Sequence, residues 1–197
     1  MQPLQIKCKI IEQLQSSSEA NVHINIFQGL PKADKMEFII QKNVEIGVNE
    51  ITPVEMKRCV VKLEDKSKEK KRERWQKIAE TAAKQSGRDY IPKVNNIADI
   101  KSICNLIQNY DIVLLAYEEE EQNTLKNELY NIKADLDPTG SNQDRPLQIA
   151  IVIGPEGGLE EQEVESLKKA GAKVVTLGKR ILRTETARNC YGCNYYI

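Results

Sequence analysis

Two short apolar runs constrain the fold of this chain more than any other feature of its sequence. Residues 112–116 read Ile-Val-Leu-Leu-Ala, and residues 147–153 are apolar except at position 148. Apolar runs of this length without polar alternation are typical of strands buried on both faces, as in a parallel sheet covered by helices. Helical patterns separate the predicted strands. The sequence therefore predicts an α/β domain with a mainly parallel sheet and helices on both faces.

The other predicted elements alternate in the same way along the chain. Further strands are expected at residues 22–26, 50–54 and 173–177. Amphipathic spacing predicts helices at residues 36–44, 67–86, 97–107, 125–132 and 159–170. Gly47 and Gly87 stand where helices should end, and Asn96 is expected to cap the third helix. The lone His23 is expected to be a surface or hydrogen-bonded residue rather than a metal ligand.

Composition excludes several classes of protein. The 29 basic and 29 acidic side chains cancel, so net charge alone does not attract nucleic acid. No apolar run approaches the roughly 18 residues of a membrane span, and no secretory leader is visible, which predicts a cytoplasmic protein without a membrane partner. The five cysteines are odd in number and mostly far apart, unlike a disulfide framework. The pair Cys190 and Cys193 lacks the further ligands of a zinc site, so no metal is predicted.

The sequence after the second apolar run is the strongest candidate for a ligand site. Residues 153–158 read Ile-Gly-Pro-Glu-Gly-Gly, at the expected carboxyl end of a strand. Open α/β sheets bind ligands there, and glycine permits close approach of the backbone. The motif is neither a P-loop nor GxGxxG. The residues alone support a ligand loop and a plain strand-to-helix turn equally. Glutamates in the following helical turn favour a ligand less anionic than phosphate.

Two further strand ends are expected at the same edge of the sheet, at residues 115–117 and 177–187. A separate feature is the segment 66–74, in which six cations are offset by two glutamates, leaving a net charge of +4. Such a segment can contact phosphates, but charge alone favours an ordinary solvated helix face.

Three stretches together resemble a known family. They are residues 30–36 (Leu-Pro-Lys-Ala-Asp-Lys-Met) with 45–48, residues 74–79 with 82–88, and the turn 153–158 with 177–178 and 181–187 (Ile-Leu-Arg-Thr-Glu-Thr-Ala). In this order and spacing they are similar to the SPOUT class of RNA methyltransferases, specifically the RsmE-type family that methylates uridine N3 in small-subunit ribosomal RNA. The resemblance spans residues 20 to 187.

The resemblance implies a SPOUT-type fold with a deep C-terminal trefoil knot, a homodimer, and S-adenosylmethionine as cofactor. It implies 16S ribosomal RNA in the small ribosomal subunit as substrate. Candidates for orienting or activating the base are Arg183, Glu156 and Glu185. Positions that match RNA-contacting positions of the family are Arg74, Gln85 and Arg88, which reverses the preference for a merely solvated helix. The implied cofactor-binding residues are Leu115, Ala116, Tyr117, Ile153, Gly154, Pro155, Gly157, Leu177, Gly178, Ile181, Leu182, Thr186 and Ala187.

Both ends depart from the family pattern. Residues 1–20 are expected to be the residual strand and linker of a truncated PUA-like N-terminal domain, and residues 21–197 the methyltransferase domain. After residue 187 the family continues as an apolar helix, whereas residues 188–197 read Arg-Asn-Cys-Tyr-Gly-Cys-Asn-Tyr-Tyr-Ile. A shifted reading frame is one hypothesis for this tail. The alternative to an active enzyme is therefore an RNA-binding module with little or no turnover.

Overall fold

The computed structural model describes residues 7–12, 19–20, 22–135, 145–178, 184 and 186. At its centre is a seven-stranded sheet in the order β3-β2-β1-β6-β5-β7, with β4 also paired to β2. Every pairing between these strands is parallel, which confirms the predicted sheet. The strands are β1 (Val22–Gly29), β2 (Glu50–Glu55), β3 (Lys93–Val94), β4 (Ala98–Asp99), β5 (Ile112–Ala116), β6 (Leu147–Ile153) and β7 (Lys173–Val175).

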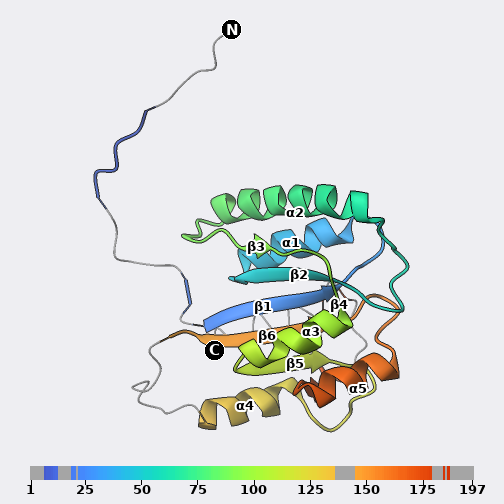
Figure 1. The fold of residues 1–197 in the computed structure, drawn as a ribbon. Coiled ribbons are helices and arrows are strands. Elements are labelled where there is room, and N and C mark those ends of the chain that lie inside the picture. Colours follow the sequence, from blue (N-terminus) through green and yellow to red (C-terminus); the bar gives the residue numbers. More distant parts are fainter. Residues whose placement is uncertain are drawn as a thin grey trace.

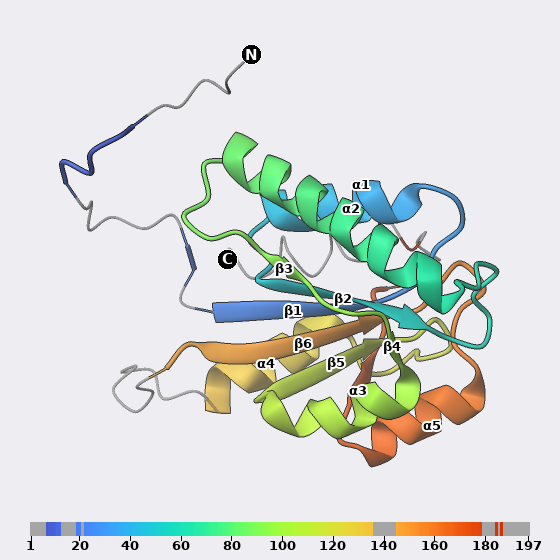
Figure 2. The ribbon, with the colours of Figure 1, turned by 45° about the horizontal axis from the view of Figure 1, so that its top comes forward.

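Helices cover the two halves of the sheet. Figure 1 shows α1 and α2 packed together beside the β2–β1 half, and α3, α4 and α5 around the β6–β5 half. In Figure 2, α3 lies in front of β5 and α4 behind it. Helices therefore cover both faces, as right-handed crossovers between parallel strands require. The helices are α1 (Lys35–Glu45), α2 (Asp65–Gln85), α3 (Ile100–Leu106), the short 3-10 helix η1 (Ile107–Asn109), α4 (Leu125–Asp135) and α5 (Glu161–Lys169).

The core lies where the central strands meet these helices. Ile149, Ala150, Ile151 and Val152 of β6 are fully buried, as expected for a strand covered on both faces. Phe27 of β1 meets Tyr110 edge to face, with ring centroids 5.7 Å apart.

Most predicted elements form close to their expected bounds. Gly47 and Gly87 adopt φ values of +92° and +68°, so glycine ends α1 and α2 as predicted. His23 is half-buried, with its Nδ1 2.9 Å from Gln148 Nε2, which confirms the hydrogen-bonded interpretation.

One expectation is wrong. Asn96 does not cap α3: the cap is Asp99, whose Oδ1 accepts from the Ser102 N–H at 2.8 Å. The pairing of β4 with β2 holds residues 98–99 in extended form, so the helix begins only at Ile100. Near the N-terminus, the described residues 7–12 join no sheet and the side chains of Ile10 and Ile11 are exposed, so the residual strand stays a prediction. A lone strand has no neighbouring strand to form hydrogen bonds with, so it is not stable by itself. Residues 1–6 and the tail 187–197 lie outside the described residues.

No helix within the described part of the chain is long and apolar enough to cross a membrane.

Candidate functional site

The carboxyl ends of β5, β6 and β7 lie side by side at one edge of the sheet. Leu115 is in register with Val152 of β6 on one side and with Val174 of β7 on the other. Just beyond, the Tyr117 N–H donates to the Val175 carbonyl at 3.2 Å. The three strand ends predicted from the sequence to hold a ligand therefore meet in space.

The glycine turn that follows β6 is closed by its own backbone. The Gly158 N–H donates to the Pro155 carbonyl at 3.0 Å, and Gly158 has a φ of +70°. Outside the turn, Arg58 Nη1 donates to the Gly157 carbonyl at 3.2 Å. A Cβ on Gly157 would come 3.0 Å from Arg58 Cβ, so glycine permits this contact.

The end of β1 presses against the same turn. A Cβ on Gly29 would lie 2.6 Å from the Pro155 nitrogen and 2.7 Å from its Cδ. Real Cβ atoms do not approach backbone so closely, so Gly29 is required for β1 and the turn to be in contact. After β7, Gly178 has a φ of +112°, and no atom of the described residues lies within 4 Å of the position its Cβ would take. The main chains of β1 and of the turn after β6 are therefore in close contact at this edge of the sheet.

Glu156, a predicted catalytic residue, is bonded to Lys32 in the loop before α1 and to Lys35 at the start of α1. Its two carboxylate oxygens accept from the Lys32 N–H at 3.1 and 3.2 Å, and Lys35 Nζ lies 2.9 Å from Oε1. Partial burial opposes ionisation of Glu156, but the hydrogen bonds from Lys35 and Lys32 outweigh it and lower the pKa of the carboxyl below its usual 4.5. Glu156 is therefore an ionised anchor for the loop, a poor arrangement for a general base.

Acidic side chains lie just after β5 and at the start of α5. Tyr117 donates its hydroxyl to Glu119 Oε2 at 2.8 Å, and this hydrogen bond raises the pKa of Tyr117 to about 12. At the start of α5, the buried Glu163 carboxylate accepts from the Glu160 N–H and the Lys57 N–H, both at 2.9 Å. Glu163 thus bonds the residue that caps α5 and joins the start of α5 to Lys57, which follows β2. The edge suits a neutral or cationic group better than a phosphate.

A cavity of about 630 Å³ lies beside the turn rather than at the three strand ends, between residues 55–63 and the starts of α3 and α5. Cys59 lines it. Burial raises the pKa of the Cys59 thiol, the direction opposite to that of activated cysteines.

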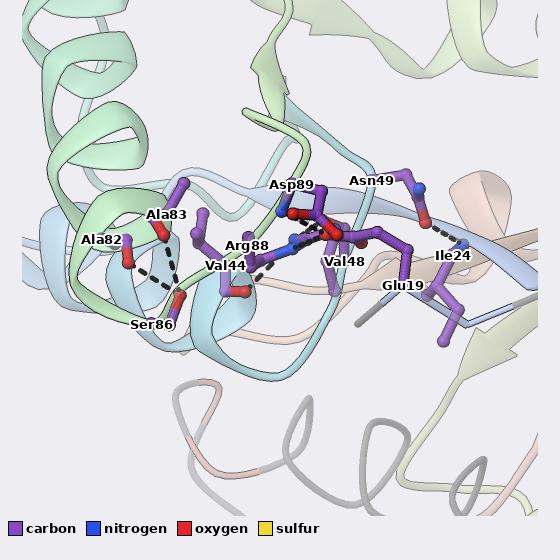
Figure 3. A network of polar contacts seen from close by, with 10 residues as sticks. All are labelled: Glu19, Ile24, Val44, Val48, Asn49, Ala82, Ala83, Ser86, Arg88 and Asp89. Carbon is purple, nitrogen blue, oxygen red and sulfur yellow. Dashed lines mark hydrogen bonds and ion pairs between the residues drawn. The ribbon is translucent and has the colours of Figure 1, made fainter. Parts of the chain in front are cut away.

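The basic residues predicted to contact RNA differ in their surroundings. Gln85 is exposed at the end of α2. Arg74 is 65 % exposed and pairs with Glu37 at 2.7 Å. The Arg88 side chain is only 5 % exposed: it pairs with Glu19 and donates to the Val44 and Val48 carbonyls (Figure 3). Arg88 therefore holds the fold together and does not present its guanidinium to RNA in this conformation, contrary to the sequence prediction.

The segment after β7 is described in part. Thr186 is exposed, and Thr184 is buried. The predicted residues Ile181, Leu182, Arg183, Glu185 and Ala187 lie outside the described residues.

Sequence reasoning missed two buried polar residues at this edge. The Thr184 hydroxyl donates to the Gly154 carbonyl at 2.8 Å, and Gln28 Nε2 donates to Thr184 Oγ1 at 3.0 Å. One signal was available: Gln28 is the only polar residue between Ile26 and Pro31, at the end of an otherwise apolar stretch.

Comparisons with known proteins agree with this geometry. A family model described as an RNA methyltransferase domain matches residues 18–191. A Bacillus subtilis protein named ribosomal RNA small subunit methyltransferase E is 42 % identical over 182 residues, covering 92 % of this chain and 68 % of the relative. A protein of the same name from Mesomycoplasma hyopneumoniae is 37 % identical, covering 92 % of this chain and 72 % of the relative.

Solved structures give the same result. A ribosomal RNA small subunit methyltransferase E from Neisseria gonorrhoeae, bound to S-adenosyl methionine, matches with a TM-score of 0.72 and 31 % identity, covering 91 % of this chain and 68 % of that one. A putative methyltransferase from Legionella pneumophila in complex with the same cofactor matches with a TM-score of 0.78 and 28 % identity, covering 92 % of this chain and 68 % of that one.

Proposed function

This chain belongs to the RNA methyltransferase domain family, and on that premise we propose that it is an S-adenosylmethionine-dependent methyltransferase acting on N3 of a uridine in 16S ribosomal RNA. The observation that carries the proposal is the family match over residues 18–191, which includes all three strand ends that meet at the sheet edge. A module that only binds RNA would not need this edge. The match therefore favours the enzyme over the non-catalytic alternative.

The residues at the edge fit the proposed cofactor. S-adenosylmethionine supplies a methyl group on a sulfonium cation, attached to a neutral adenine nucleoside. The backbone ends of β5, β6 and β7 are neighbours in the sheet, which suits a ligand held by backbone groups, and Glu119 beside Tyr117 suits a cation. We assign cofactor binding to residues 115–117, 153–157 and 177–178 together with Ile181, Leu182, Thr186 and Ala187.

The chemistry asks two things of the protein. Methyl transfer is an in-line displacement, so the uracil N3 must be held in line with the transferred methyl. The N3 proton must also leave, which requires a group to accept it or to stabilise the anion. We assign these roles to Arg183 and Glu185, in the segment that Thr184 fastens to the turn after β6. Glu156, already ionised and bonded, orients the loop 30–35 instead.

The proposal extends to the finer properties of the family. We propose a C-terminal trefoil knot, a homodimer, and action on the small ribosomal subunit in the cytoplasm. Residues 1–20 are proposed to be the end of an RNA-holding N-terminal domain, followed by the methyltransferase domain. Arg74 and Gln85 remain the proposed RNA contacts on α2.

Two measurements test the function. Titration calorimetry of the chain with S-adenosylmethionine is expected to show saturable binding. Incubation with small ribosomal subunits that lack the modification, followed by nucleoside analysis, is expected to yield 3-methyluridine. Binding without any methylated uridine would favour the RNA-binding alternative, and a methyl group on another base or on ribose would overturn the substrate assignment.

A further inference from the structure

Gln28 is an unusual residue for its position. It lies on β1 at the centre of the sheet, in register with Pro53 of β2 and Ile153 of β6, and it is 0 % exposed. Burying an amide costs free energy unless the amide is hydrogen-bonded, and an apolar side chain of similar size would avoid that cost. A buried amide at the carboxyl end of a central strand therefore suggests a specific task.

The amide joins three segments that are far apart in sequence. Gln28 Nε2 lies 3.0 Å from the Gly29 carbonyl, 3.0 Å from Thr184 Oγ1 and 3.5 Å from the Gly154 carbonyl. The Thr184 hydroxyl donates in turn to the Gly154 carbonyl at 2.8 Å. Gln28, Thr184 and Gly154 thus form a closed triangle of hydrogen bonds, here called the Gln28 triangle.

Gln28 takes part in the triangle through its Nε2 amide group and not through its Oε1 oxygen. Among the described residues, Oε1 has no hydrogen-bond partner although it is buried. An amide hydrogen donates to the Thr184 oxygen, which leaves the single Thr184 proton for Gly154. A carboxylate at position 28 would face the Gly29 and Gly154 carbonyls without a proton to share.

We propose that Gln28 is a positioning residue for S-adenosylmethionine: through the Gln28 triangle it fixes the turn after β6 to the segment after β7, two of the strand ends assigned to the cofactor. The inference rests on the proposed function. Because the ligand would be held largely by backbone groups, its affinity depends on how firmly those backbone segments are held relative to one another. Neither Gln28 nor Thr184 needs to touch the cofactor.

The chain offers a matched control in Asn43. Like Gln28, Asn43 is 0 % exposed, donates its side-chain NH2 to a backbone carbonyl (Ile39, 3.0 Å), and has a buried oxygen with no partner among the described residues. It lies near the C-terminal end of α1, where its carbonyl accepts from Val48, and it has no hydrogen bond to the turn among the described residues. Asn43→Leu therefore removes the same kind of buried amide away from the site.

The test measures the Kd of S-adenosylmethionine by calorimetry and Tm without ligand, for the wild type, Gln28→Met, Thr184→Val, Thr184→Ser and Asn43→Leu. Losing one such hydrogen bond is expected to raise Kd about tenfold in Gln28→Met and in Thr184→Val. Thr184→Ser keeps the hydroxyl and is expected to bind as the wild type does. Asn43→Leu is expected to lower Tm as Gln28→Met does, with an unchanged Kd.

The double variant Gln28→Met with Thr184→Val adds a second criterion. Because both changes break one network, the double variant is expected to bind about as weakly as either single variant, and not a hundredfold more weakly. A wild-type Kd in Gln28→Met, or an equal loss of affinity in Asn43→Leu, would overturn the role of Gln28 and leave the proposed function standing. Failure of the wild type itself to bind the cofactor would remove the function and this role together.

Discussion

Glu19 and Arg88 are joined by two charge-assisted hydrogen bonds across 69 positions of the sequence, Arg88 Nε to Oε1 at 3.1 Å and Nη2 to Oε2 at 2.5 Å. The same guanidinium donates Nη1 to the Val44 and Val48 carbonyls at the end of α1 (Figure 3). One side chain thus fastens the segment before β1, the end of α1 and the loop after α2 to one another.

Replacing Arg88 by Met is expected to destabilise the protein by about 3 kcal/mol, because it removes the charged partner of the partly buried Glu19 carboxylate and a donor to the Val44 and Val48 carbonyls. Urea unfolding at pH 7 measures the loss. Arg74→Met is the control: it removes an exposed ion pair with Glu37 and is expected to cost less than about 1 kcal/mol. Equal losses in the two variants would show that Arg88 is not a structural anchor.

The same pair predicts a dependence of stability on pH. The hydrogen bond from Arg88 lowers the pKa of Glu19 below its usual 4.5. A carboxyl with a lowered folded-state pKa stabilises the fold above its unfolded pKa, and this contribution disappears as pH falls through the folded pKa. Glu19→Gln is therefore expected to be less stable than the wild type by about 2 kcal/mol at pH 7. Unfolding curves at pH 7 and pH 3 should show this difference shrinking at the lower pH, and a constant difference would contradict the linkage.

The contact between β1 and the turn after β6 gives a further prediction. Gly29→Ala places a Cβ 2.6 Å from the Pro155 nitrogen, so one of the two backbones must move. We expect a loss of roughly 2 kcal/mol in unfolding free energy, in the range of an overpacked core, together with weaker S-adenosylmethionine binding. Gly87→Ala is the control, since no atom of the described residues lies within 4 Å of its Cβ position and its φ of +68° is unfavourable. It is expected to cost about 1 kcal/mol and to leave cofactor affinity unchanged.

Much of the fold can be predicted from local patterns in the sequence. The features that the sequence did not predict depend on residues far apart in the chain. The apolar runs at β5 and β6 and the helical spacing of α1 and α2 depend on residues near one another in the chain, so they were predictable. The strands β3 and β4 have two residues each and exist because β2 offers them an edge. The burial of Arg88 depends on Glu19, and the role of Gln28 depends on Thr184, 156 positions away. No local pattern contains those partners.

Contact with RNA is predicted for the exposed lysines of α2. Lys70 and Lys77 are two helical turns apart and exposed, whereas Trp75 and Ala79 of the same helix are buried. No ion pair holds either lysine among the described residues. Lys70→Gln with Lys77→Gln is expected to weaken ribosomal RNA binding and to reduce the slope of log K against log salt by about 1 per lost phosphate contact. Lys126→Gln on α4 is the control for loss of charge alone, and an equal effect there would argue against a specific surface on α2.

The role of Glu156 is open to a sharp kinetic test. If it only orients the loop 30–35, Glu156→Gln loses an ion pair between partly exposed side chains, which is worth less than about 1 kcal/mol and lowers the methylation rate about fivefold at most. Loss of a general base costs about 100-fold or more and removes the corresponding limb of the pH–rate profile. Because the pKa of Glu156 lies below 4.5, its titration cannot shape the rate between pH 6 and 9.

Single-turnover methylation of small ribosomal subunits across that range is expected to give parallel profiles for Glu156→Gln and the wild type. The matched variant Glu185→Gln is expected to show the large loss instead, and a reversal of the two results would return the base to Glu156.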